Sequence, residues 1–101
     1  MYGLTAQDEM SAVPGQREAL IAIVAAGSAS MQGCLSYIVA KDREDESGIW
    51  ITEVWDSEAS HTASLTLPIV KEAISKGRPL IAGLGPRYVT TPIGGHGMGA
   101  R

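Results

Sequence analysis

The chain has 101 residues, a formal net charge of −3, one cysteine, two histidines and no phenylalanine. This length leaves room for a single hydrophobic core, and the absence of clustered Lys and Arg argues against nucleic acid or an anionic membrane surface as a partner. A lone cysteine and the lack of an apolar run of membrane-spanning length are typical of a cytoplasmic protein, which is the location we expect.

The first part of the chain predicts a strand, a helix and a second strand. Residues 2–13 alternate apolar and polar side chains, as a strand does, and Asp8-Glu9 interrupts the alternation and indicates a bulge or an exposed edge. Over residues 16–30 the apolar positions recur at helical spacing. Alternation returns over residues 34–41, so we expect a second strand there.

The central segment of the chain combines the most apolar strand with a sharp change to helix. Within residues 49–55, apolar side chains occur at both odd-numbered and even-numbered positions, so both faces of the strand are apolar. This pattern predicts a strand at the centre of a sheet that is covered on both faces. The charged loop 42–48 joins it to the preceding strand as a hairpin. At Asp56-Ser57 the alternation stops, and either side chain can cap a helix N-terminus.

The last part of the chain predicts two helical pieces and a final strand. We expect a helix over residues 57–67, a break at Pro68, a further helical piece to residue 76, and a strand over residues 84–92. The order βαββαβ predicts an α+β, ferredoxin-like domain over residues 1–92, with helices on one face of the sheet. Residues 93–101 are rich in glycine and form a C-terminal tail.

The predicted fold implies a partner. A ferredoxin-like sheet leaves one face uncovered, yet the predicted hairpin over residues 34–55 is apolar on both sides. Two copies that stack these faces would bury them, so we expect a homodimer.

Several segments together resemble the antibiotic biosynthesis monooxygenase family, which belongs to the dimeric α+β barrels. They are Val-Pro-Gly-Gln-Arg at 13–17, Gly-Cys-Leu-Ser-Tyr at 33–37, and Ile-Thr-Glu-Val-Trp-Asp-Ser at 51–57. The resemblance extends over nearly the whole chain to about Pro92. It implies a cofactor-independent monooxygenase that uses molecular oxygen to oxidise a small aromatic quinol or phenol, without metal or flavin.

The resemblance also indicates site residues. Trp55 matches the family tryptophan at the end of a strand, and Tyr37 matches an aromatic position on the neighbouring strand. Glu53 lies in the same Glu-x-Trp segment. Many members carry a histidine on the following helix at the position that Ser64 occupies here, whereas His61 lies one turn earlier.

The chemistry of the residues leaves two interpretations open for each candidate. His61 is either a surface histidine, opposite a packed stripe of Ala59, Ala63 and Leu67, or an acid/base group with a pKa suited to moving a quinol proton. Trp55 is either core or the wall of a pocket. We therefore predict His61 and Trp55 as catalytic candidates, and as substrate-binding candidates Tyr37, Glu53, Ser60, Ser64 and Arg78.

Two other functions remain open. One is a non-catalytic dimer that binds a small ligand, and the other is a relative that binds or degrades haem, which requires a histidine directed into the pocket. Two histidines and one cysteine make a metal site unexpected, and residues 94–97 do not form a phosphate-binding loop because they neither join a strand to a helix nor contain Lys.

Overall fold

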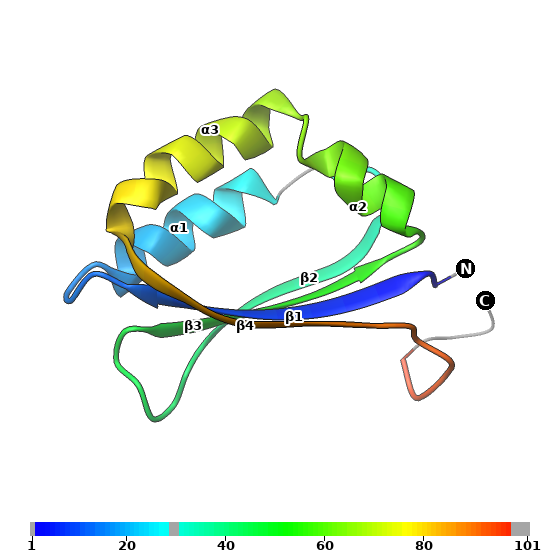
Figure 1. Ribbon diagram of the computed structural model, residues 1–101, viewed down its shortest axis with the longest axis horizontal. Helices are drawn as coiled ribbons and strands as arrows, with labels where there is room; N and C mark the ends of the chain where they lie inside the picture. Colours follow the sequence, from blue (N-terminus) through cyan, green and yellow to red (C-terminus); the bar gives the residue numbers. More distant parts are fainter. Residues whose placement is uncertain (1, 29–30, 98–101) are drawn as a thin grey trace.

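A four-stranded antiparallel sheet with the strand order β2-β3-β1-β4 forms one layer of the protein (Figure 1). The computed structural model describes residues 2–28 and 31–97. The strands are β1 (Leu4–Ala12), β2 (Cys34–Lys41), β3 (Gly48–Trp55) and β4 (Ile81–Thr90). The helices are α1 (Arg17–Gly27), α2 (Glu58–Ser64) and α3 (Pro68–Gly77), and a 3-10 turn, η1 (Arg78–Leu80), joins α3 to β4. This order confirms the predicted ferredoxin-like α+β fold.

All three helices lie on one face of the sheet, and the opposite face is uncovered (Figure 1). The alternation of β3 explains the arrangement, because Ile49, Ile51 and Trp55 are buried under the helices while Trp50 and Val54 lie on the other face and are only partly buried. Among the described residues, no helix is long and apolar enough to span a membrane.

The core beneath the helices is divided into two clusters. One consists of Ala12, Leu20, Ile49 and Ile51. The other consists of Leu4, Ala6 and Trp55. On β3 the residue between Ile51 and Trp55 on this face is Glu53, so a carboxyl side chain separates two apolar clusters.

Most predicted boundaries lie within two residues of the observed ones, and three boundaries differ by three residues. Strand β2 has the predicted bounds, whereas β4 begins three residues earlier than expected because pairing with β1 extends to Ile81. Helix α1 ends at Gly27 instead of continuing to residue 30, although residues 29–30 themselves lie outside the described residues. Helix α2 is shorter than predicted and ends at Ser64.

A bulge in β4 is the feature of the sheet that matters most for the site. Asp8 pairs with Arg87 and Met10 pairs with Leu84, so β4 has one more residue between these two pairs than β1 has. In a regular strand two residues three apart face opposite sides, but the extra residue brings Leu84 and Arg87 to the helix-covered face. The register shift coincides with Asp8-Glu9, but the extra residue lies on β4 and β1 pairs regularly with β3, so the predicted bulge is not in the first strand. Because β1 pairs on both sides, the predicted exposed edge is wrong as well.

Candidate functional site

Glu53 is a buried carboxyl group in the middle of the helix-covered face, with 5% of its surface exposed. Its strand neighbours are Tyr37 on β2 and Ala6 on β1. The indole Nε1–H of Trp55 donates a hydrogen bond of 2.9 Å to Glu53 Oε1. Trp55 is fully buried, so this contact both satisfies its N–H and fixes one oxygen of the carboxyl group.

Asp8 and Arg87 approach Glu53 from the other side. Arg87 Nη1 donates to both carboxyl oxygens of Asp8, at 2.6 and 2.7 Å. The same nitrogen lies 3.8 Å from Glu53 Oε2. One guanidinium therefore lies near two carboxyl groups on neighbouring strands, Asp8 on β1 and Glu53 on β3, whose register positions are two residues apart.

His61 points inward from α2 toward this cluster. The Ser57 hydroxyl accepts a hydrogen bond from the backbone N–H of Ser60 and so caps the helix. His61 Nε2 lies 3.9 Å from Glu53 Oε1, which is too long for a hydrogen bond. Its ring meets Trp55 edge-on, with centroids 5.3 Å apart and planes at 75°.

The predicted packed stripe of α2 is therefore wrong. Ala59 and Ala63 are exposed, whereas His61 is partly buried and Ser64 is fully buried. The helix is only two turns long, so its rotation follows the Ser57 cap and the contact with Trp55 and not an apolar stripe. The interpretation of His61 as a surface residue is corrected with it.

The environment shifts the protonation of three groups in the cluster. Burial, together with the nearby Asp8 carboxyl, raises the pKa of Glu53 to about 7, against the effects of the Trp55 hydrogen bond and of Arg87. Burial, followed by the charge of Arg87, lowers the pKa of His61, so its imidazole is neutral at pH 7. Burial, followed by the charges of Glu53 and Asp8, raises the pKa of Tyr37, which therefore keeps its O–H as a donor.

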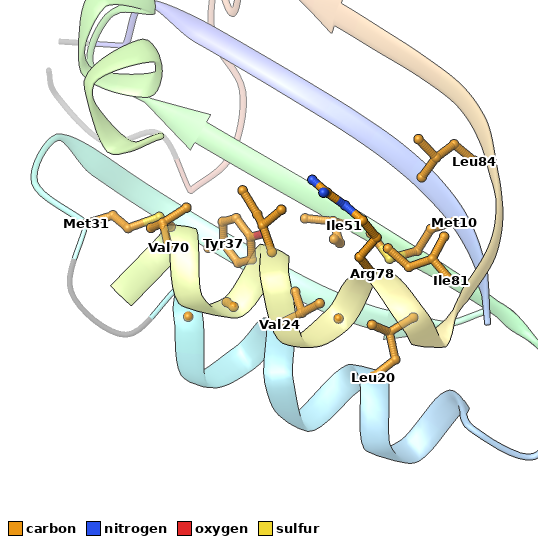
Figure 2. A pocket seen from close by; sticks show the side chains of 14 residues that line it. Met10, Leu20, Val24, Met31, Tyr37, Ile51, Val70, Arg78, Ile81 and Leu84 are labelled. Carbon is orange, nitrogen blue, oxygen red and sulfur yellow. The ribbon is translucent and has the colours of Figure 1, made fainter. Parts of the chain in front are cut away.

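A cavity of about 420 Å³ lies beside the cluster, between α1, α3 and the sheet. This volume falls within the usual range for small-molecule sites. Its lining is mostly apolar and includes Leu20, Val24, Ile51 and Val70. Figure 2 shows Tyr37 toward the same end as Met31 and Val70, with Leu84 toward the other end.

Two lining residues bring polar groups to this apolar cavity. Tyr37 lies on β2 opposite Glu53, so it borders both the cavity and the carboxyl cluster. Arg78 comes from the end of α3, and its guanidinium extends toward the strands and away from α1 (Figure 2). Both residues were predicted from the sequence to bind substrate, and the structure brings both to one cavity.

Ser60 and Ser64 occupy different surroundings from those two residues. Ser60 Oγ lies 3.1 Å from Ser57 Oγ at the N-terminus of α2. The hydroxyl of Ser64 donates a hydrogen bond of 2.6 Å to the backbone carbonyl of His61. Both hydroxyls are thus engaged within α2, and neither residue lines the cavity.

Asp8 is a member of the cluster that the sequence analysis missed as a site residue. In the sequence, Asp8 is distinguished only as a break in the alternation of the first strand. A carboxyl group on the helix-covered face of a central strand was the available signal, but its partner Arg87 lies 79 residues away. Within residues 2–28 and 31–97, no three His, Cys, Asp or Glu side chains converge as metal ligands would.

Comparison with known proteins shows which family and which solved structures the chain is similar to. Residues 3–76 match the family model for antibiotic biosynthesis monooxygenases. A solved structure from Chloroflexus aurantiacus J-10-fl, assigned to the antibiotic biosynthesis monooxygenases, is 58% identical, with 95% of this chain and 98% of that chain covered and a TM-score of 0.91. A protein from Pseudomonas aeruginosa shares the fold at 22% identity, with 93% and 97% covered and a TM-score of 0.80. No curated protein matches the chain.

Proposed function

The chain belongs to the antibiotic biosynthesis monooxygenase family, and from this premise we propose that it oxidises a small aromatic quinol or phenol with molecular oxygen. The observation that carries the proposal is the position of Tyr37, which borders an apolar cavity on one side and the Glu53 cluster on the other. An apolar ring would occupy the cavity, with its acidic hydroxyl directed toward Tyr37.

Glu53 is the group best suited to receive the substrate's proton. A general base works best when its pKa lies near the working pH, and burial brings the pKa of Glu53 to about 7. The proton would pass through the Tyr37 hydroxyl, which gives its own proton to Glu53 while it accepts that of the substrate. His61, neutral and 3.9 Å from Glu53, is a second acceptor beside it.

The substrate anion would itself supply the electrons for oxygen reduction. A quinol that reacts with one O₂ gives a hydroxylated quinone and one water, so atoms and electrons balance without any other reductant. The protein would contribute a dry cavity, a hydrogen-bond donor at Tyr37 and a positive charge at Arg78 that stabilises the oxyanion. This scheme requires no flavin or metal.

Oxygen uptake with a panel of quinols and phenols tests the proposal. We expect at least one compound to be oxidised faster than it is without protein, and Glu53→Gln to lower kcat by about 10²-fold or more. His61→Ala measured in parallel shows which of the two acceptors carries the proton. Glu46→Gln, an exposed change of the same charge on the β2–β3 loop, is the matched control and should leave kcat unchanged.

Two outcomes would contradict this function, and a third would contradict the role given to Glu53. If no compound raises oxygen uptake above the spontaneous rate but some quench tryptophan fluorescence saturably, the protein is a non-catalytic ligand-binding member. If haem binds with one equivalent per chain and His61→Ala removes its absorption shift, the haem interpretation replaces ours. Equal kcat in wild type and Glu53→Gln would remove Glu53 from the mechanism.

We also propose that two copies pair through the uncovered face of the sheet. That face carries Ile38 and Tyr88, both more than half exposed, together with the partly buried Trp50 and Val54. Large apolar side chains exposed on one sheet face favour an interaction surface, although polar side chains of β1 lie between those of β3 and Tyr88. A second copy stacked on this face would bury them, and we infer a homodimer.

A further inference from the structure

The Asp8–Arg87 pair lies next to the proposed base but outside the cavity. Arg87 is held by two short contacts to Asp8, and it reaches Glu53 Oε2 at 3.8 Å. Trp55 holds the other oxygen of Glu53. The Glu53 carboxyl is thus hydrogen-bonded at one oxygen to an indole on its own strand, and its other oxygen faces a cation from an edge strand.

We propose that Asp8 and Arg87 are positioning residues that hold Glu53 for proton transfer and set the pH range in which it acts as a base. The inference rests on the proposed function for its consequence in catalysis, but the control of Glu53 by the pair can be measured without any substrate. Arg87 stabilises the ionised form of Glu53, and Asp8 opposes this effect because it carries a like charge and engages the same guanidinium.

Other charged or titratable groups also face Glu53, from every element packed against it. Tyr37 and Cys34 lie on β2, and His61 approaches from α2. The hydroxyl and imidazole are neutral at pH 7 because the pKa of Tyr37 is raised and that of His61 is lowered, and the pKa of the Cys34 thiol is also raised. Asp8 and Arg87 therefore supply the charges that distinguish one protonation state of Glu53 from the other.

The bulge in β4 positions Arg87 beside Asp8. It turns Arg87 toward the helix-covered face at the register position of Asp8, two residue pairs away from Glu53 along the sheet and therefore on the same face. A Cβ at Gly85 would meet the Glu9 side chain, beginning with its carboxylate end, so a larger residue at the bulge would have to displace Glu9. The pair is held by the sheet itself and does not depend on a bound ligand.

Neither Asp8 nor Arg87 lines the cavity, and this separates their role from substrate binding. If they act through Glu53, substitutions should change kcat and its pH dependence while KM stays nearly the same. A group that contacts the substrate would change KM instead.

The direct test is an NMR titration of the Glu53 side-chain carboxyl carbon in the full chain. Arg87→Met should raise the pKa of Glu53 by roughly one pH unit or more, because a cation within about 4 Å is removed. Asp8→Asn should lower it, because a like charge is removed and Arg87 becomes free to pair with Glu53. Lys41→Met, which breaks the exposed Lys41–Glu18 pair, is the matched control and should leave the Glu53 titration unchanged.

Two further variants distinguish an effect on the Glu53 titration from misfolding of a variant. Arg87→Lys keeps the charge and should return the Glu53 titration toward that of wild type. The double variant Asp8→Asn with Arg87→Met should titrate close to wild type if the two effects oppose each other. Backbone amide shifts away from the cluster report whether each variant is folded.

The results that overturn the inference are distinct from those that overturn the function. Shifts in the same direction for Asp8→Asn and Arg87→Met, or shifts no larger than that of Lys41→Met, would refute the positioning role. If the Glu53 titration responds as expected but no quinol is oxidised, the positioning pair stands and the proposed oxidation fails. With an active substrate, the acid limb of kcat should follow the Glu53 pKa in each variant.

Discussion

The protonation of Glu53 should make the stability of this protein fall as the pH rises toward neutrality. Its pKa rises from about 4.5 in the unfolded chain to about 7 in the folded protein, so the unfolded chain releases its proton first. Between these two values the free energy of unfolding should decrease by about 1.4 kcal/mol per pH unit. The loss reaches about 3 kcal/mol at most and stays constant above pH 7.

Glu53→Gln isolates this effect because a neutral amide imitates the protonated carboxyl. Its carbonyl oxygen can still accept the Trp55 N–H, so the hydrogen bond at 2.9 Å is retained. We expect the variant to match wild type within about 0.5 kcal/mol at pH 4.5 and to exceed its stability by up to about 3 kcal/mol at pH 8.5. The variant would thus gain stability at the pH where it loses catalysis.

Urea unfolding followed by tryptophan fluorescence measures the difference at the two pH values. Both proteins must be compared at one chain concentration, because assembly makes stability depend on concentration. Glu46→Gln serves again as the control for a change of net charge, and its difference from wild type should be the same at both pH values. A Glu53→Gln variant that is less stable than wild type at pH 8.5 would show that the ionised carboxyl stabilises the fold, contrary to this reasoning.

Two further predictions concern packing and assembly. A Cβ on Gly27 would lie 2.5 Å from the Cβ of Ala73, so Gly27→Ala should separate α1 from α3 and lower the free energy of unfolding by about 1–3 kcal/mol. Urea unfolding measures this effect, and Gly83→Ala, where a Cβ would meet nothing within 4 Å, is the matched control. Ile38→Glu puts a charge on the uncovered face of the sheet. Sedimentation should show this variant as a monomer at concentrations where wild type is a dimer. If wild type itself sediments as a monomer at micromolar concentration, the proposed dimer is wrong.

The sequence alone predicted the elements whose signals are local. The alternation over residues 34–41, the serine cap of α2 and the break at Pro68 depend on neighbouring residues, and the structure confirms each of them. Trp55 and Tyr37 were also identified as candidate residues through the family resemblance, and Arg78 was identified separately as a cation that could stabilise an oxyanion. The structure places Trp55 beside Glu53, and Tyr37 and Arg78 at the cavity.

The side of α2 that faces the sheet could not be derived from its own residues. Small apolar residues suggested a buried stripe of Ala59 and Ala63, yet the buried side carries His61 and Ser64. A short helix gains little from burying alanine, whereas the Ser57 cap and the ring of Trp55 each fix its rotation through a specific contact. The inward position of His61 therefore depends on a strand that the helix sequence does not contain.

The carboxyl cluster was decided by tertiary structure alone. Asp8 and Arg87 lie 79 residues apart in sequence and meet because β4 pairs with β1 and carries an extra residue at the bulge. A change of one residue in that register would turn Arg87 to the uncovered face, away from Asp8 and Glu53. Periodicity predicts which residues form strands, but the protonation of Glu53 depends on how distant strands align, because charge interactions act between side chains that only the folded sheet brings together.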